Sequence, residues 1–287
     1  MSIDPPRLFV VHWNRPLECA ATVTEFKKQC PELRTLVLDN NSKSQAIESL
    51  QTQLEPPIEL VRLPENKGWG QALNIALRRW LGNETSAFCF ISAHDARPAP
   101  GCIARLLAAM NADPQIGIAC PEYSDGSVPR LSSWHGVAQK IAPPLAPGSV
   151  RAIDVPHGTL MLVRRDCLAQ TGLFDERYFA YGDEHELGAR AGRRGWKIAL
   201  VGGALVANPE TSTPSELRSY LFTRNSLLLV HDYFGRRAAW RRAALILLNT
   251  VRLFLRSRRG EFAFSARARW RGCRDFFLGR FGPPPAQ

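Results

Sequence analysis

The sequence has no run of about 18 uncharged apolar residues, the length that a helix needs to cross a bilayer. Its longest apolar stretch, residues 243–251, is bounded by Arg242 and Arg252. No two of its 7 cysteines form a CxxC pair, which argues against a cysteine-ligated metal site or a disulfide scaffold. There is also no P-loop and no internal repeat. These absences predict a globular protein of a reducing compartment, either soluble or lying on a membrane surface.

Acidic residues are nearly missing from the C-terminal segment. From Tyr233 to the end there are 13 arginines, no lysine, and only Glu261 and Asp275 as acids. The net charge of +11 therefore belongs to this segment, and residues 1–232 are neutral overall. The whole chain of 287 residues is 45% hydrophobic, enough to bury a substantial core. We expect a neutral globular body that carries a basic tail.

Short apolar runs alternate with helical patterns along the first 110 residues. The expected strands are residues 7–12, 34–39, 58–63 and 87–92, and the expected helices are residues 16–30, 44–54, 68–82 and 101–110. This alternation predicts an α/β domain with a mostly parallel central sheet flanked by helices. Residues 121–150, which are rich in Pro, Gly and Ser, predict a long loop or hairpin over the ligand crevice of that sheet.

Polar residues follow the expected strands at the points where the strands end. They are Asn14, Asp39 to Ser42, Asn66 and the pair His94–Asp95. Ligands of parallel sheets bind beyond the carboxyl ends of the strands, so we expect these side chains around one crevice. Asp95 is suited to hold a hard cation on phosphate oxygens, although a turn-capping Asp is an equal alternative. His94 is either a second ligand or a strand-end histidine satisfied by the backbone.

An acidic cluster opens another predicted helix. Asp183, Glu184 and Glu186 lie within four residues at its start, where the helix dipole favours carboxylates. A solvated first turn is one interpretation. The other is a general base, because a run of aromatic residues precedes the cluster and would raise a carboxyl pKa. These aromatic residues are Phe174, Tyr178, Phe179 and Tyr181.

Several segments, taken in order, resemble the family-2 glycosyltransferases, and most closely the rhamnosyltransferase-like branch that builds bacterial surface polysaccharides such as lipopolysaccharide. The segments are VVHWNRP, VLDNNS, PENKGWGQALNIAL, ISAHDARPAPG, HGTLMLVRRDCLAQTGLFDERYFAYGDEHELGAR and YLFTRN. The resemblance covers about residues 7–230 and is most specific over residues 158–190. It implies the GT-A fold, a nucleotide-sugar donor, a divalent metal and inversion at the anomeric carbon.

The resemblance also implies roles for individual residues. Donor-binding residues would be Asn14, Arg15, Asp39, Asn41, Ser42, Asn66, Gly68, Asn74 and His94. Asp95 matches the last position of the DxD motif and would hold Mg²⁺ or Mn²⁺. Glu184 falls at the catalytic carboxylate with Asp183 beside it, and Trp196 would lie on the acceptor side.

The chain departs from the family pattern at three places. Ala93 occupies the first DxD position. The order Asp183–Glu184 reverses the usual acidic pair, which leaves the identity of the base open between them. Asn208 stands near the place of a family histidine that often lies close to the metal. The first and third departures predict weak metal affinity or a dispensable metal.

Residues 236–259 have the pattern of an amphipathic helix. One stripe is cationic, with Arg242, Arg252, Arg256 and Arg259, and another is apolar, with Trp240, Leu247, Val251 and Phe254. Such a helix is typical of a membrane interface, so an anionic membrane surface is the expected partner. The helix could instead pack on the catalytic domain with its arginines in water. Nucleic acid is not an expected partner, since no recognised nucleic-acid module accompanies the charge.

The sequence therefore predicts a GT-A domain at residues 1–232 and a basic amphipathic helical tail at residues 233–287. The expected function is transfer of a sugar from a nucleotide-sugar donor to a hydroxyl of a glycan or polyprenyl-linked acceptor. We expect the enzyme to be peripheral on the cytoplasmic face of the cell membrane. Two alternatives stay open, a catalytically degenerate scaffold and a sugar nucleotidyltransferase. The latter normally has a Gly-rich, Lys/Arg-bearing loop after the first strand, which the segment HWNRPLEC lacks.

Overall fold

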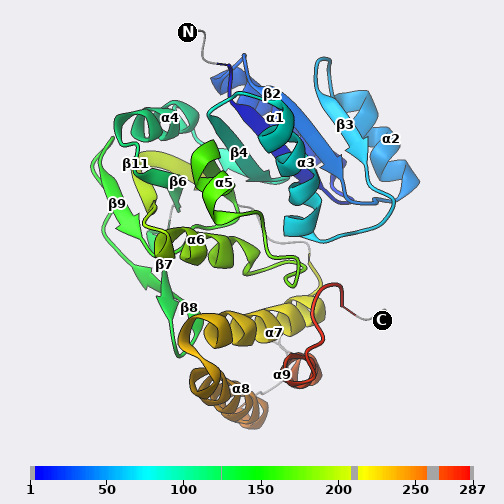
Figure 1. Cartoon of the computed structure of the whole chain (residues 1–287). Helices are drawn as coiled ribbons and strands as arrows, with labels where there is room; N and C mark the ends of the chain where they lie inside the picture. Colours follow the sequence, from blue (N-terminus) through cyan, green and yellow to red (C-terminus); the bar gives the residue numbers. More distant parts are fainter. Residues whose placement is uncertain (1–3, 124, 208–212, 257–264, 285–287) are drawn as a thin grey trace.

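A computed structural model describes residues 4–123, 125–207, 213–256 and 265–284 (Figure 1). The strands are β1 (Arg7–His12), β2 (Arg34–Asp39), β3 (Glu59–Arg62), β4 (Phe88–Ala93), β5 (Arg97–Pro98), β6 (Ile116–Tyr123), β7 (Ser127–Ser132), β8 (Gly136–Ile141), β9 (Val150–Ile153), β10 (Leu160–Arg164) and β11 (Lys197–Ala207). The helices are α1 (Pro16–Gln29), α2 (Ser44–Gln53), α3 (Trp69–Asn83), α4 (Cys102–Ala112), α5 (Arg165–Thr171), α6 (Asp183–Arg193), α7 (Ser215–Phe234), α8 (Arg236–Arg256) and α9 (Ala266–Phe277).

One large sheet organises the body of the protein. Its strand order is β3-β2-β1-β4-β10-β6-β11-β5, and β9 pairs with β11. The first four strands are parallel to one another, and so are β6 and β11. β10 is antiparallel to both of its neighbours. The prediction of an α/β fold with a mostly parallel central sheet flanked by helices is confirmed.

Helices cover both faces of this sheet, which explains why its strands are continuous apolar runs. Along β1, Leu8 and Val10 point into the core on the side of α1, α2 and α4. Phe9 and Val11 point into the core on the side of α3, α5 and α6. Because both faces are buried, the polar side chains that a ligand can reach lie at or just beyond the carboxyl ends of these strands.

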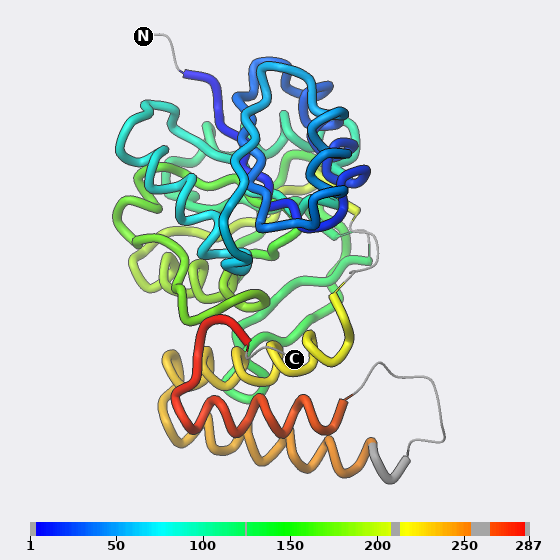
Figure 2. The backbone as a smooth tube through the Cα atoms, turned by 90° about the vertical axis from the view of Figure 1, so that its right-hand side faces the viewer, coloured from blue at the N-terminus to red at the C-terminus, as the bar shows by residue number. Residues whose placement is uncertain are grey.

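Three helices form a separate layer below the sheet (Figures 1 and 2). α7, α8 and α9 pack on one another around small apolar clusters that include Leu227, Ala243 and Cys273. The β7–β8 hairpin reaches this layer, where the Arg241 guanidinium lies 4.6 Å from the centre of the Trp134 ring. None of the described helices is long and apolar enough to cross a membrane. The predicted tail helix is thus packed on one side against α7 and α9.

A buried polar contact ties α9 to α7. Asp275, which is 1% exposed, accepts hydrogen bonds from the Tyr220 hydroxyl at 3.1 Å and from Arg274 Nε at 2.9 Å. The Tyr220 hydroxyl also accepts a hydrogen bond from Arg224, another buried residue, at 3.3 Å. Burial lowers the pKa of Arg224, and the Asp275 charge opposes this effect. The predicted domain boundary at residue 232 falls inside α7, and the division into two parts stays a prediction.

We predict that Asp275→Ala destabilises the protein strongly. The substitution removes the carboxylate that accompanies the buried Arg224 charge, and loss of one partner of such a group costs about 3 kcal/mol. The change in free energy of unfolding is measured by urea denaturation. Glu48→Ala is the control, because Glu48 is exposed and has no ion pair among the described residues. Equal stability of the two variants would show that the contact does not hold α9 in place.

Candidate active site

A cavity of about 350 Å³ opens at the carboxyl ends of β1 and β4. Its lining brings together Asp95, Asp183 and Glu184, which come from distant parts of the chain. The rest of the lining is Val11, Trp69, Ala93, His94, Tyr123, Gly158, Thr159, Ala180, Tyr181 and Thr213. The cavity therefore has two acidic walls, one after β4 and one at the start of α6.

The loop that carries Asp95 is held by α1. Thr22 Oγ1 donates to the carbonyl oxygens of His94 at 2.8 Å and Ala96 at 3.0 Å. His94 Nδ1 lies 3.3 Å from the carbonyl oxygen of Val11, and burial lowers the pKa of the His94 imidazole. These contacts leave the Asp95 carboxylate at the cavity, where the side chain is nearly buried.

Asp183 is the buried, hydrogen-bonded carboxyl group of the second acidic wall. It is 1% exposed, and its Oδ2 accepts a hydrogen bond of 2.9 Å from the backbone N–H of Gly70 at the start of α3. A Cβ at Gly70 would lie 2.8 Å from that oxygen, so the contact needs a glycine there. Burial raises the pKa of Asp183 well above its usual range, and the charge of Glu184 raises it further. Both effects favour the neutral form of Asp183 over the charged one.

Glu184 is the more accessible carboxylate of the pair. Its Oε2 accepts a hydrogen bond of 3.0 Å from the backbone N–H of Gly182, and its Oε1 lies 3.6 Å from His185 Nε2. Tyr181, which directly precedes Gly182, has a φ of 66°, a left-handed conformation that is costly for a bulky side chain. Asn225 Nδ2 on α7 holds this turn through 2.8 Å hydrogen bonds to the carbonyl oxygens of Ala180 and Tyr181.

The predicted donor-binding residues of the first two strand ends lie together. The parallel register places His12 beside Asp39, and His12 Nδ1 is 2.9 Å from Asp39 Oδ1. Asn14 N–H donates to Ser42 Oγ at 2.9 Å. Burial alone would raise the pKa of Asp39, but hydrogen bonds from His12 and Ser42 hold it below its usual value. Asp39 is fully buried, and its hydrogen bonds hold His12 at the end of β1 and Ser42 after β2 in place.

The remaining predicted donor residues divide into two groups. Arg15 and Asn41 do not line the cavity: Arg15 Nε donates to Glu18 at 2.8 Å, and Asn41 is exposed with a φ of 60°. Asn66 is next to Gly68, accepting a 2.9 Å hydrogen bond from its backbone N–H. Gly68 itself leaves no room for a side chain, since a Cβ would meet the Phe179 carbonyl oxygen.

Asn74 is away from the cavity. Its amide exchanges two 3.0 Å hydrogen bonds with the backbone of Phe174 and is buried. It therefore positions the segment that leads into α6, which in turn carries the acidic wall. Asn74 is not part of the cavity lining, and its role in donor binding stays a prediction.

The residues present can hold a divalent cation only together with a ligand. Among the described residues no group of three or more His, Cys, Asp or Glu side chains is placed to bind a metal. Asp95 supplies one carboxylate, and oxygen ligands are what Mg²⁺ and Mn²⁺ prefer. A donor diphosphate would have to supply further oxygen ligands. The Asp95 carboxylate and these phosphate oxygens together would fit a hard cation that the protein and the donor share.

The structure places Trp196 and the β7–β8 hairpin away from the cavity, whereas the sequence predicts them beside it. Trp196 is at the far end of α6 from Glu184, where its Nε1 donates to Gln170 Oε1 at 3.2 Å, so it lines no wall of the cavity. The reason is that the 11 residues of α6 separate the two ends by about 16 Å. Asn208 lies outside the described residues. The β7–β8 hairpin is also absent from the lining, to which Tyr123 at the end of β6 contributes instead.

Sequence reasoning missed Asn225 and His12 as residues that build the site. Asn225 belongs to the segment YLFTRN, whose polar residue in an apolar helix was the available signal. His12 could have been found from the parallel pairing of the first two strands, which sets it against Asp39. Thr159, beside the cavity at 3.0 Å from the Tyr123 hydroxyl, had no comparable signal.

The chain matches the family model "Glycosyl transferase family 2" over residues 8–170. It is 27% identical over 247 residues to the N-acetylglucosaminyl-diphospho-decaprenol L-rhamnosyltransferases of two Mycobacterium tuberculosis strains, CDC 1551 / Oshkosh and H37Rv. Each alignment covers 74% of this chain and 78% of the mycobacterial protein.

Solved structures share the fold at low identity. GalNAc-T7 with UDP, GalNAc and Mn²⁺ has a TM-score of 0.66 at 14% identity. The match covers 96% of this chain and 56% of the GalNAc-T7 chain. The mannosyltransferase PcManGT of Pyrobaculum calidifontis, in complex with GDP-Man and Mn²⁺, has a TM-score of 0.59 at 15% identity, with 97% of this chain and 88% of that chain covered.

These likenesses confirm the GT-A fold, and the family model extends over more than half of the chain. The earlier resemblance to family-2 glycosyltransferases is confirmed as well. The chain belongs to glycosyl transferase family 2 and is a glycosyltransferase.

Proposed function

We propose that the protein transfers a sugar, with inversion, from a nucleotide-sugar donor to a hydroxyl group of a glycan acceptor. The observation that carries this proposal is that Asp95 and Glu184 line the same cavity at the carboxyl ends of the strands. One carboxylate is placed to hold the diphosphate side of a donor. The other is placed to deprotonate a nucleophile. A cavity with both is what a single displacement at an anomeric carbon requires.

Asp95 would hold Mg²⁺ or Mn²⁺ together with the donor diphosphate. When bound, the cation supplies positive charge that stabilises the departing nucleoside diphosphate. Ala93 at the first DxD position contributes no second carboxylate, so the protein's own hold on the metal is weak and depends on the donor. His94, kept neutral by burial, adds no charge that would repel the cation.

Glu184 would act as the base, and Asp183 would position it. Of the two, Asp183 is enclosed and bonded to Gly70, whereas the Glu184 carboxylate remains at the cavity. In this role Asp183 would be neutral, and its proton would lie on Oδ1, a buried atom with no hydrogen-bond partner among the described residues, from which it would donate a hydrogen bond to Glu184. Glu184 then accepts the proton of the acceptor hydroxyl as the hydroxyl oxygen attacks the anomeric carbon from the face opposite the leaving group.

The acceptor in this proposal is a polyprenyl-linked glycan of bacterial surface polysaccharide biosynthesis. The mycobacterial relatives are named for N-acetylglucosaminyl-diphospho-decaprenol, a lipid-linked acceptor. Seven large apolar side chains of α8, α9 and the following residue are exposed in this chain: Trp240, Leu247, Leu248, Val251, Trp270, Phe277 and Leu278. The rings of Trp240 and Phe277 stack at 4.3 Å across the two helices, so the apolar stripes meet. We call these seven residues the α8–α9 face.

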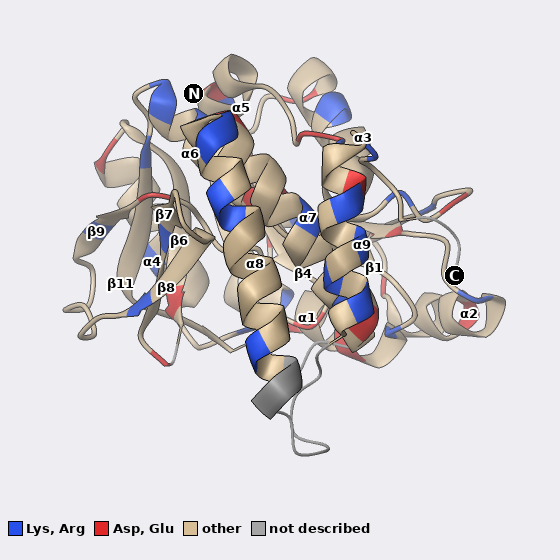
Figure 3. Cartoon of the chain, turned by 90° about the horizontal axis from the view of Figure 1, so that it is seen from below, with Lys and Arg blue, Asp and Glu red and all other residues tan. Residues whose placement is uncertain are grey.

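The α8–α9 face supports attachment to the cytoplasmic face of the membrane. In the view from below, α8 and α9 lie side by side with basic residues along both (Figure 3). Aromatic and aliphatic side chains flanked by arginines are typical of helices at an anionic interface, where each basic residue contributes about 1 kcal/mol. Such attachment would bring the enzyme to the surface where a lipid-linked acceptor is concentrated.

We predict that Asp95→Ala and Glu184→Gln each abolish turnover. For Glu184→Gln, the loss of the base lowers kcat by about 10²–10⁴-fold while the fold is kept. Release of nucleoside diphosphate from a panel of nucleotide sugars with Mn²⁺ is the measurement, and Glu48→Gln is the control. If the native protein released no nucleoside diphosphate with any donor, the alternative of a catalytically degenerate scaffold would be favoured. That alternative stays open because Asp95 is the single carboxylate of the DxD motif in this chain.

We predict that the Asp183→Asn variant becomes increasingly more stable than the native protein as pH rises. The unfolded pKa of an Asp is about 3.9, and the folded pKa of Asp183 is raised, so the native protein loses stability as pH increases between these two values. Asn is neutral at every pH and can still accept from Gly70. The difference in Tm between variant and native protein should therefore widen from pH 4 to pH 8.

Asp125→Asn is the control for this titration. Hydrogen bonds from Ser127 lower the pKa of Asp125, so its stability contribution is complete above pH 4 and the Tm difference stays constant from pH 5 to pH 8. If Asp183→Asn behaved in the same way, Asp183 would be charged in the folded protein and the proposed donation to Glu184 would be wrong.

We predict that the double substitution Leu248→Ser, Val251→Ser weakens binding to anionic vesicles about ten-fold or more without lowering Tm. Each side chain is exposed in the protein and would lose apolar contact only with lipid. Sedimentation with vesicles is the measurement, and Leu17→Ser on α1 is the matched control, since Leu17 and Leu248 are each 67% exposed. Equal sedimentation of all three proteins would remove the membrane proposal.

A further inference from the structure

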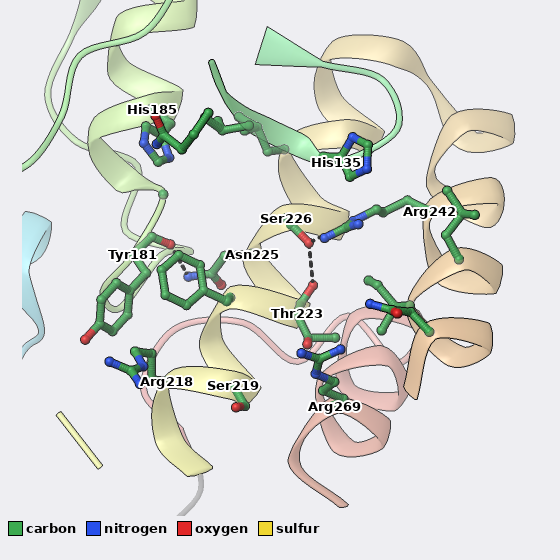
Figure 4. Close-up of a pocket in the computed structure, with 18 residues that line it drawn as sticks. His135, Tyr181, His185, Arg218, Ser219, Thr223, Asn225, Ser226, Arg242 and Arg269 are labelled. Carbon is green, nitrogen blue, oxygen red and sulfur yellow. Dashed lines mark hydrogen bonds between the residues drawn. The ribbon is translucent and has the colours of Figure 1, made fainter. Parts of the chain in front are cut away.

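A second and larger cavity, of about 660 Å³, lies between the sheet body and the helical layer. It is bounded by the β7–β8 hairpin, the start of α6, and helices α7, α8 and α9 (Figure 4). Its volume is that of a site for a small molecule or a lipid headgroup. None of the residues so far assigned to donor or metal lines it.

Three arginines, one from each helix of the layer, line this cavity: Arg218, Arg242 and Arg269. Arg242 reaches α7, where its Nε lies 3.4 Å from Ser226 Oγ, and Arg269 points toward Thr223 on the same helix (Figure 4). No carboxylate among the described residues forms an ion pair with Arg218 or Arg242. Burial, together with the charge of Arg269, lowers the pKa of Arg242 to about 10.

This charge arrangement favours an anionic ligand with several oxygens. Guanidinium groups match phosphate oxygens in pairs and remain charged when partly buried. The hydroxyl groups of Ser219 and Thr223 line the same wall and can add hydrogen bonds. An anion placed there would relieve the repulsion between the Arg242 and Arg269 charges. A phosphate or diphosphate group has the size and charge for this position.

The lining of this cavity also includes apolar side chains. Leu229, Leu245 and Ile246 line it, and the next residues of α8, Leu247 and Leu248, belong to the exposed α8–α9 face. An apolar chain attached to a bound anion would therefore pass from the cavity toward the surface that we propose to meet lipid. A free phosphate would make no use of these side chains.

The second cavity adjoins the catalytic one at the start of α6. The side chain of Tyr181 lines both cavities, with its ring stacked on Phe222 at 4.7 Å. His185 lines the second cavity and its Nε2 lies 3.6 Å from Oε1 of Glu184, which lines the first. A group that extends from the arginines toward α6 would therefore approach the proposed base beside His185 and the Tyr181 turn.

We propose that the second cavity binds the diphosphate of a lipid-linked acceptor between Arg242 and Arg269 and directs the acceptor sugar toward Glu184. This inference rests on the proposed function and adds the acceptor subsite to it. The apolar chain leaves along α8, and the donor occupies the cavity of Asp95. The two substrates thus enter from different sides of the Tyr181 turn, and the anion site selects acceptors by their diphosphate.

The test compares Arg242→Gln and Arg269→Gln with two matched controls. Arg252→Gln on α8 and Arg267→Gln on α9 remove the same charge from the same helices at exposed positions. The substrate is a short-chain polyprenyl-diphosphate sugar in detergent, with the donor found by the hydrolysis screen. We expect KM for this acceptor to rise at least ten-fold in the first pair and less than two-fold in the controls. KM for the donor and the rate of donor hydrolysis should be unchanged in all four.

A second acceptor, the same sugar on a neutral alkyl chain, separates anion recognition from damage to the fold. Its KM should be high with the native protein and should not change in Arg242→Gln. Arg242→Lys should recover part of the affinity for the diphosphate acceptor. The inference is overturned if Arg242→Gln affects both acceptors equally, or affects the diphosphate acceptor no more than Arg252→Gln. Absence of nucleoside diphosphate release from the native protein would instead overturn the proposed function, and the subsite with it.

Discussion

The placement of the candidate base depends on one contact between two helix N-termini. The backbone N–H of Gly70 at the start of α3 donates to the buried carboxyl group of Asp183 at the start of α6. The chain direction at this point is further fixed by the hydrogen bond of 2.8 Å from Trp69 N–H to the Phe179 carbonyl oxygen. A side chain at Gly68 or Gly70 would collide with these partners. Because Asp183 cannot move, its neighbour Glu184 is held at the cavity.

Sequence reasoning could predict which strand ends meet, but not which carboxylate faces the ligand. Parallel strands bring their ends to one edge, so the contact between Asn14 and Ser42 follows from the strand pattern alone. The choice between Asp183 and Glu184 depends on a glycine 113 residues away from Asp183, and no local pattern carries that information. The partner of Asn74, Phe174, is likewise 100 residues away, so the sequence could not show that Asn74 also holds the segment before α6. Its role in donor binding stays a prediction.

The helical tail shows a similar limit. Its amphipathic pattern was visible, and Trp240, Leu247 and Val251 are exposed as the apolar stripe requires. Arg242, however, was placed on the cationic stripe that was expected to face the membrane, whereas its side chain is turned toward α7 and lines the second cavity. A helical wheel divides a helix into two faces, whereas α8 has three environments: packed core, cavity and open surface. Phe254 and Arg256 lie at the end of α8, outside the side chains that the structure describes, and Arg259 lies outside the described residues.

α7 connects the helical layer to the turn that precedes Glu184. On one side Asn225 holds the Tyr181 turn that precedes Glu184, and on the other Tyr220 bonds to the buried Asp275 of α9. The left-handed conformation of Tyr181 costs free energy that these hydrogen bonds must offset. A shift of α7 caused by ligand or lipid on α8 and α9 would therefore act first on the turn that positions Glu184. Through Asn225, this layer therefore contributes directly to the geometry of the turn before Glu184.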